Sequence, residues 1–220
     1  SSPPWRAGSF TSNLADHSMT ELFPASDIAA IQKFYQSYEP CRALDNYRGI
    51  AAAVGAVKNL FFGDSITAAW PLHEFFPQYS VLNRGIGGDN PVGLHTRLEQ
   101  DVFQYSPRRV FMLVGINGIQ APQELIIARI CHVAQAIRER GIAVYPGSIL
   151  PLRSPDQWNR FQYQDKIVAI NRELAAWSAA QGLVFLDYHS ALKDTDGQLA
   201  ERFARPDGTH VQFPAYIEMA

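Results

Sequence analysis

The chain has 220 residues, of which 47% are hydrophobic and 18% charged, and its formal net charge is −2 at pH 7. A chain of this length and composition can bury a large core, and one main domain is expected. The charge balance argues against nucleic acid or an anionic membrane surface as a partner, because no basic block supplies the attraction. No apolar run in the sequence is long enough to span a bilayer.

Residues 1–56 are predicted to form an N-terminal extension that consists of an irregular arm and a helix. Residues 1–25 lack periodicity and are rich in Ser, Pro, Ala and Asn, which is typical of an irregular arm. A helix is expected to begin at Ser26 and to end at Pro40. Residues 41–56 are ambiguous, with a second short helix as one interpretation. The sequence leaves open whether the extension packs on the core or covers a crevice.

The sequence gives little information on the cellular compartment or on the state of the two cysteines. The chain begins at Ser1 without Met or a charged-then-apolar leader, which slightly favours a mature exported chain over a trimmed one. Cys41 and Cys131 lack metal-ligand spacing, and Cys131 lies within a helical apolar pattern that favours a buried, inert thiol. A disulfide between the two is an alternative that nothing else in the sequence supports.

From Leu60 onward, short apolar runs alternate with helical patterns. Strands are expected over residues 60–62, 80–83, 109–115, 142–150 and 183–186, and helices over residues 91–103, 122–140 and 161–181. Strands separated by such long crossovers predict a mostly parallel sheet with helices on both faces. With right-handed crossovers, this predicts a three-layer, flavodoxin-like α/β fold with five strands over residues 57–220.

Ser65 stands where the first predicted strand turns into an apolar stretch with helical character. Its hydroxyl would lie in the crevice beyond the carboxyl ends of the strands, where ligands of open α/β sheets bind. Its amide would lie at a helix N-terminus, where negative charge is stabilised. This arrangement suits a nucleophile that attacks a carbonyl, and the common alternative is that Ser65 only caps the helix.

Further polar positions follow other predicted strands at the same edge of the sheet. A glycine cluster that includes Gly88 follows the second strand, Asn117 follows the third, and Asp207 and His210 lie in the loop region after the fifth. Taken singly, the glycines and Asn117 are also ordinary turn residues. Their convergence on one crevice shifts the interpretation of Ser65 from a helix cap towards catalysis.

Each of these positions has a task in acyl transfer. His210 is the candidate base that accepts the proton of Ser65, and Asp207, three residues earlier, can fix the imidazole tautomer from one tight turn. The amides of Ser65 and Gly88 and the side-chain amide of Asn117 are candidate donors to an oxyanion. These residues together predict a serine hydrolase.

Asp187 and His189 form a competing pair at the end of the fifth predicted strand. The pair lacks a local turn that would bring the carboxylate onto the ring nitrogen, so Asp187 is expected to end the strand and anchor the loop. Two other motifs are excluded, because the glycine cluster is not G-x-G-x-x-G and Ser65 does not lie in G-x-S-x-G. The remaining histidines are scattered, and no metal is expected.

Four sequence blocks resemble those of the SGNH (GDSL-type) hydrolases and lie in the family's order. They are Gly63-Asp64-Ser65-Ile66-Thr67, Asn83-Arg84-Gly85-Ile86-Gly87-Gly88-Asp89, Val114-Gly115-Ile116-Asn117 and Asp207-Gly208-Thr209-His210. The resemblance covers roughly residues 57–216, and the second block is most similar to the platelet-activating-factor acetylhydrolase-like bacterial esterases. Gly118 stands where the family often has Asp, which puts the rigidity of Asn117 in question.

The resemblance implies Ser65 as nucleophile, His210 as base and Asp207 as its orienting group. It also implies an oxyanion hole from Ser65, Gly88 and Asn117, with Asp64 in a supporting role and with no cofactor. We expect a serine ester hydrolase that works through an acyl-enzyme on short acyl esters, chiefly acetyl esters of a carbohydrate or a similar small substrate.

Two alternatives to this function remain. The first is a thioesterase or lysophospholipase on longer acyl chains, with an apolar groove lined by Trp70, Phe75 and Phe76. The second is a catalytically silent carbohydrate- or lipid-binding protein of the same fold. The expected partner is a small-molecule or glycan ester, and the sequence does not predict an oligomeric state.

Overall fold

Four parallel strands form the sheet at the centre of the molecule, in the order β2-β1-β3-β4. The strands are β1 (Asn59–Gly63), β2 (Val81–Gly85), β3 (Arg109–Leu113) and β4 (Ala143–Pro146). The computed structural model describes residues 18–38 and 43–220, so most of the predicted arm and Cys41 lie outside the described residues. In the register of the sheet, Gly63 pairs with Gly85 and with Leu113, so the carboxyl ends of three strands share one edge. The predicted parallel α/β fold is confirmed.

The fifth predicted strand, over residues 183–186, is reduced to a single parallel bridge between Leu186 and Gly147. Leu186 donates its N–H to the carbonyl of Pro146 (2.8 Å) and accepts a hydrogen bond from the N–H of Ser148 (2.9 Å). Pro146 has no N–H with which to extend the bridge towards the N-terminus of the segment. On the other side, the N–H of Tyr188 donates to Leu186 of its own segment as α11 (Tyr188–Leu192) begins. The segment over residues 183–186 therefore lies beside the edge of the sheet and is joined to it by one bridge.

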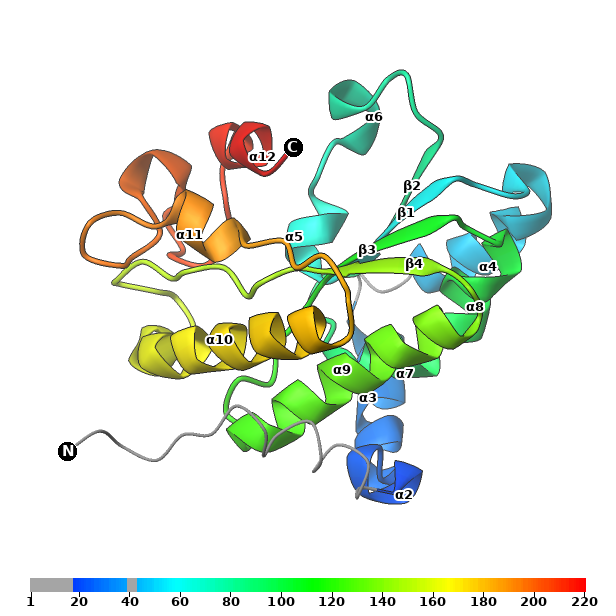
Figure 1. Ribbon diagram of the computed structural model, residues 1–220, viewed down its shortest axis with the longest axis horizontal. Helices are drawn as coiled ribbons and strands as arrows, with labels where there is room; N and C mark the ends of the chain where they lie inside the picture. Colours follow the sequence, from blue (N-terminus) through cyan, green and yellow to red (C-terminus); the bar gives the residue numbers. More distant parts are fainter. Residues whose placement is uncertain (1–17, 39–42) are drawn as a thin grey trace.

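Alternate residues of the strands point to opposite faces of the sheet and enter two separate cores. Leu60 and Phe62 of β1 belong to one core, whereas Phe61 belongs to the other. The helices on the two faces differ accordingly (Figure 1). One face carries α7 (Pro91–Thr96), α8 (Leu98–Asp101), α9 (Gln123–Glu139) and α10 (Gln164–Ala180), and the other α5 (Ser65–Ala68), α6 (Leu72–Phe75), α11 (Tyr188–Leu192) and α12 (Phe213–Met219).

The helix predicted over residues 91–103 is broken at Arg97, between α7 and α8. The guanidinium of Arg97 is buried and donates to the carbonyl oxygens of Gly63 (3.0 Å) and Arg84 (2.9 Å). It also lies between the carboxylates of Asp89 and Asp101, at 2.7 and 2.9 Å. The break falls at the residue whose side chain ties this segment to the ends of β1 and β2.

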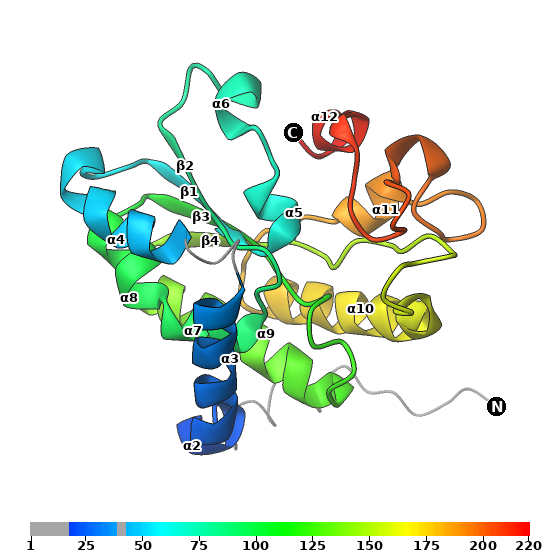
Figure 2. The same ribbon diagram turned by 180° about the vertical axis from the view of Figure 1, so that it is seen from behind.

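The N-terminal helices pack directly on this framework (Figure 2). They are α2 (Met19–Leu22), α3 (Ala25–Ser37) and α4 (Ala43–Val54). Ile31 of α3 is 5% exposed and belongs to the core on the α9 side of the sheet. The hydroxyl of Tyr35 on α3 donates to Asp89 at 2.7 Å, so α3 also contacts the loop that follows β2. The extension is thus anchored by both apolar and polar contacts.

Candidate active site

Ser65 is the first residue of α5 and follows the end of β1 by two positions. The backbone must pass very close to its neighbours here, because a Cβ on Gly63 would lie 2.2 Å from the carbonyl oxygen of Leu113. The helix is capped by Asp64, whose carboxylate accepts a hydrogen bond from the N–H of Ile66 at 2.9 Å. The alternative in which Ser65 serves only as the cap is therefore wrong, and its hydroxyl is available for other contacts.

Asp64 is 2% exposed, and this burial raises its pKa to about 7. The hydrogen bond from the N–H of Ile66 opposes that shift, while the nearby charge of Asp89 adds to it. Asp64 does not line the cavity that Ser65 borders. Asp64 therefore contacts the turn into α5 from outside the cavity.

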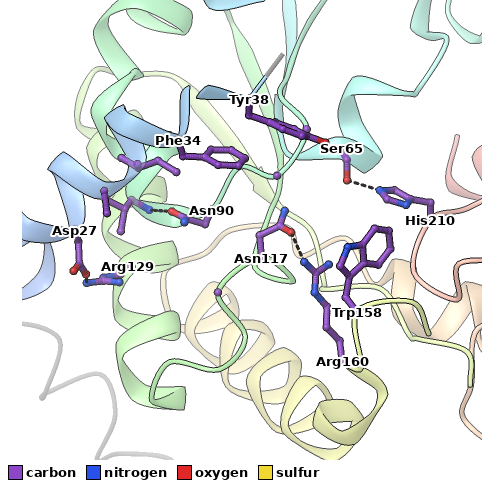
Figure 3. Close-up of a pocket in the computed structure, with 16 residues that line it drawn as sticks. Asp27, Phe34, Tyr38, Ser65, Asn90, Asn117, Arg129, Trp158, Arg160 and His210 are labelled. Atoms are coloured by element: carbon purple, nitrogen blue, oxygen red, sulfur yellow. Dashed lines mark hydrogen bonds and ion pairs between the residues drawn. The ribbon is translucent and has the colours of Figure 1, made fainter. Parts of the chain in front are cut away.

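Ser65, His210 and Asp207 form one chain of hydrogen bonds. Nε2 of His210 lies 2.8 Å from the hydroxyl oxygen of Ser65 (Figure 3), and Nδ1 lies 3.0 Å from Oδ2 of Asp207. Oδ1 of Asp207 accepts the backbone N–H groups of Thr209 (2.9 Å) and His210 (2.7 Å). This tight turn holds the carboxylate against the ring, as the three-residue spacing predicted.

The carboxylate of Asp207 remains ionised in this setting. Partial burial raises its pKa, but the backbone hydrogen bonds from His210 and Thr209 and the adjacent imidazole outweigh it. The net pKa of Asp207 lies below its ordinary value. Asp207 is therefore an anion that can accept a ring N–H.

The predicted oxyanion donors border the same cavity as Ser65 and His210. Gly88 has φ +77°, and a Cβ there would lie 2.5 Å from the ring of Phe34, so a glycine is required. The side-chain nitrogen of Asn117 donates to the carbonyl of Asp89 at 2.8 Å. Arg160 donates to the side-chain oxygen of Asn117 at 3.1 Å. Sequence analysis missed Arg160, because no motif or spacing in its loop marks it.

The cavity has a volume of about 580 Å³ and is lined by residues from both halves of the chain. On one side lie residues of α3 and its C-cap, including Phe34 and Tyr38, and on another lies Trp158 (Figure 3). Tyr38 and Trp158 are 42% and 41% exposed, so both rings are available to a bound molecule. α3 therefore forms part of the cavity wall as well as packing on the core.

Asp187 and His189 take different positions from the Asp207–His210 pair. Asp187 was expected to end a strand and anchor the loop, and it instead caps α11 by accepting the N–H of Ser190 at 3.1 Å. His189 is 6% exposed, and its backbone N–H donates to the hydroxyl of Ser148 at 2.8 Å. Within the described residues its Nε2 has no hydrogen-bond partner, and burial lowers its pKa. Neither residue of this pair lines the cavity beside Ser65.

The apolar groove considered for long acyl chains is not continuous with Ser65. Trp70 and Phe76 line a second cavity of about 440 Å³, and among residues 18–38 and 43–220 none lines both cavities. Phe75 borders neither cavity and packs against Phe213, with ring centroids 5.2 Å apart. No helix in the described part of the chain combines the length and hydropathy needed to cross a bilayer.

Cys131 lies on α9 and is 2% exposed, and its thiol is free. Burial raises the pKa of this thiol. The predicted burial of Cys131 is confirmed.

Comparison with known proteins bears on the fold and on the family of the chain. The family model of GDSL-like lipases and acylhydrolases matches residues 61–212. Among solved structures, a GDSL-like lipase from Bacteroides thetaiotaomicron has 23% identity and a TM-score of 0.73, covering 80% of this chain and 92% of that one. A protein from Streptococcus pneumoniae, described as a candidate platelet activating factor, has 24% identity and a TM-score of 0.75, covering 89% and 95%.

A catalytic mutant of an acetylxylan esterase from Geobacillus stearothermophilus is a further structural neighbour. It has 18% identity and a TM-score of 0.60, and the match covers 75% of this chain and 91% of that one. No curated protein sequence matches the chain. The solved structures support the fold, and the family model covers more than half of the chain. The resemblance seen in the four sequence blocks is thereby confirmed: the chain belongs to the GDSL-like lipase and acylhydrolase family and is an ester hydrolase.

Proposed function

We propose that the enzyme removes short acyl groups, chiefly acetyl, from esters of a carbohydrate or a similar small polyhydroxy alcohol, through an acyl-enzyme on Ser65. The observation that carries the mechanism is the chain of contacts from the Ser65 hydroxyl through His210 to Asp207, at 2.8 and 3.0 Å. Such a chain activates a serine that would otherwise be a weak nucleophile.

In the first half of the reaction, Asp207 accepts the Nδ1–H of His210 and keeps Nε2 free to take the Ser65 proton. The Ser65 oxygen attacks the ester carbonyl, and the resulting oxyanion receives N–H groups from Ser65, Gly88 and Asn117. His210 then returns the proton to the departing alcohol. In the second half, His210 activates a water molecule that hydrolyses the acyl-enzyme.

The lining of the cavity supports a polar, ring-bearing substrate over a long acyl chain. Exposed aromatic rings of Tyr38 and Trp158 offer flat apolar surfaces, while Asn90 and Arg160 offer polar groups at the same cavity. A few placed polar groups among apolar walls are typical of small-molecule sites. The separation of the Trp70 cavity from Ser65 removes the main support for the thioesterase or lysophospholipase alternative.

A panel of p-nitrophenyl esters from acetate to palmitate, together with acetylated xylo-oligosaccharides, tests this proposal. We expect the highest kcat/KM on acetate, a steep fall with chain length, and release of acetate from the oligosaccharides. Rising activity with chain length would contradict the proposal and favour the long-chain alternative. Silence on every ester, with binding to oligosaccharides retained, would favour a catalytically silent binding protein. The Ser65→Ala variant serves as the blank.

A further inference from the structure

Asn117 is held by hydrogen bonds at both ends of its side-chain amide. Its nitrogen donates to the carbonyl of Asp89 at 2.8 Å, and its oxygen accepts a hydrogen bond from Arg160 at 3.1 Å (Figure 3). An amide nitrogen carries two hydrogens, and the bond to Asp89 uses one. No other acceptor for this nitrogen is found among the described residues, so the second N–H of Asn117 remains for the cavity that Ser65 and His210 border.

The backbone beside Asn117 gives little support of its own. Gly118 follows with φ +84°, and a Cβ placed there would meet nothing within 4 Å. In the family resemblance this is the position where an aspartate is frequent. The orientation of the Asn117 amide therefore depends on partners from elsewhere in the chain, and Arg160 lies 43 residues further along.

The side chain of Arg160 is held in place by a contact with Trp158. Its guanidinium lies 5.1 Å from the centroid of the Trp158 ring, in a cation–π contact. The Trp158 ring in turn meets His210 edge-on, with centroids 5.4 Å apart. Partial burial lowers the pKa of Arg160, whereas Asp156 and Asp64 raise it. Arginine remains charged throughout the ordinary pH range, so this is a fixed cation beside the oxyanion donors.

We propose that Arg160 is a positioning residue for the oxyanion hole, which fixes the Asn117 amide and polarises it so that its free N–H becomes a stronger donor. This inference rests on the proposed role of Asn117 in the reaction. A cation that donates to an amide oxygen withdraws electron density from the amide nitrogen, and chains of hydrogen bonds strengthen one another in this way. The benefit appears only when negative charge develops on the substrate oxygen, so it should affect kcat more than KM.

The Arg160→Met variant removes the donor and the charge while keeping an unbranched apolar side chain. With p-nitrophenyl acetate we expect kcat/KM to fall roughly 10- to 100-fold, mostly in kcat. This is less than the roughly 100- to 1,000-fold expected when an oxyanion donor itself is removed. Arg172→Met on α10 is the matched control, because Arg172 is 69% exposed and pairs only with the neighbouring Glu173 among the described residues. The control should retain wild-type kinetics.

A double-mutant cycle with Asn117→Ala separates positioning from a direct role. If Arg160 acts through Asn117, Arg160→Met should change kcat/KM by less than about 2-fold in the Asn117→Ala background. An equal loss in both backgrounds, or no loss in the single variant, would overturn the inference. Arg160→Gln, which keeps a neutral donor, replaces Met in the cycle if thermal melting shows that Arg160→Met is unfolded. If Ser65→Ala retains turnover, the proposed function fails, whereas an inactive Ser65→Ala with an unaffected Arg160→Met refutes only the role of Arg160.

Discussion

Two aspartate–histidine pairs lie near the same end of the sheet, and only one of them is arranged for catalysis. In the Asp207–His210 pair, one carboxylate oxygen holds the turn and the other contacts the ring, which meets Ser65. In the Asp187–His189 pair, the carboxylate caps a helix and the ring is buried without a partner for Nε2 among the described residues. Proximity in sequence is therefore not sufficient; the turn must return the carboxylate to the ring and leave the far nitrogen facing a nucleophile.

The largest expected effect separates the two histidines. Ser65→Ala and His210→Ala should each reduce kcat by roughly 10⁴-fold or more, because each removes a member of a unit that acts together. His189→Ala should leave the kcat of the folded enzyme near that of the wild type, since His189 does not line the cavity. Kinetics on p-nitrophenyl acetate, normalised to the folded fraction from circular dichroism, check this. A folded His189→Ala protein without activity would show that the assignment of the catalytic base to His210 is wrong.

Substitution of Asp207 should reduce activity more than substitution of Asp187, but the difference should be smaller than that between the two histidines. Asp207→Asn should reduce kcat by roughly 10²- to 10⁴-fold, because an amide no longer selects the tautomer that leaves Nε2 free. Asp187→Asn should have little effect on either activity or stability, since Asn caps helices about as well as Asp. Steady-state kinetics and thermal melting of both variants test the contrast. Comparable activity losses in both variants would remove the distinction between the pairs.

The smallest expected effect concerns the pH dependence of stability. Burial lowers the pKa of His189, Lys193 lowers it further and Asp187 opposes the shift. The unfolded chain therefore binds a proton first as the pH falls below the ordinary histidine pKa of 6.5, and this lowers the free energy of unfolding. In His189→Gln this loss should be smaller by up to about 1.4 kcal/mol for each pKa unit of the shift. Chemical denaturation between pH 8 and pH 5 measures it, and an equal or steeper loss in the variant would contradict this account.

The framework of the site was predictable because its signals are local. The strand–helix alternation predicts which strand ends share an edge, and the three-residue spacing from Asp207 to His210 predicts the turn that joins carboxylate and imidazole. Each strand, helix and turn in these patterns is marked by residues close together in the chain. The capping of α5 by Asp64 was within reach of the same reasoning, because an aspartate directly before a helix is a common cap.

The remaining features depend on contacts between distant segments. Arg97 lies at the break in a predicted helix and its guanidinium binds carbonyl oxygens on β1 and β2, while Arg160 reaches Asn117 from a loop without a motif. The position of α3 beside the cavity likewise involves distant segments, through Ile31 in the core and the bond from Tyr35 to Asp89. The fifth strand is limited on one side by the missing N–H of Pro146, which matters only once the pairing partner is known.

The most direct test of the account is to identify the residue that becomes covalently modified. The wild-type enzyme would be treated with a fluorophosphonate, which phosphonylates activated serines, and the adduct located by peptide mass spectrometry. We expect one adduct on Ser65, formed rapidly in the wild type and in His189→Ala but very slowly in His210→Ala. An adduct on another residue, or labelling of Ser65 at the same rate without His210, would contradict the account.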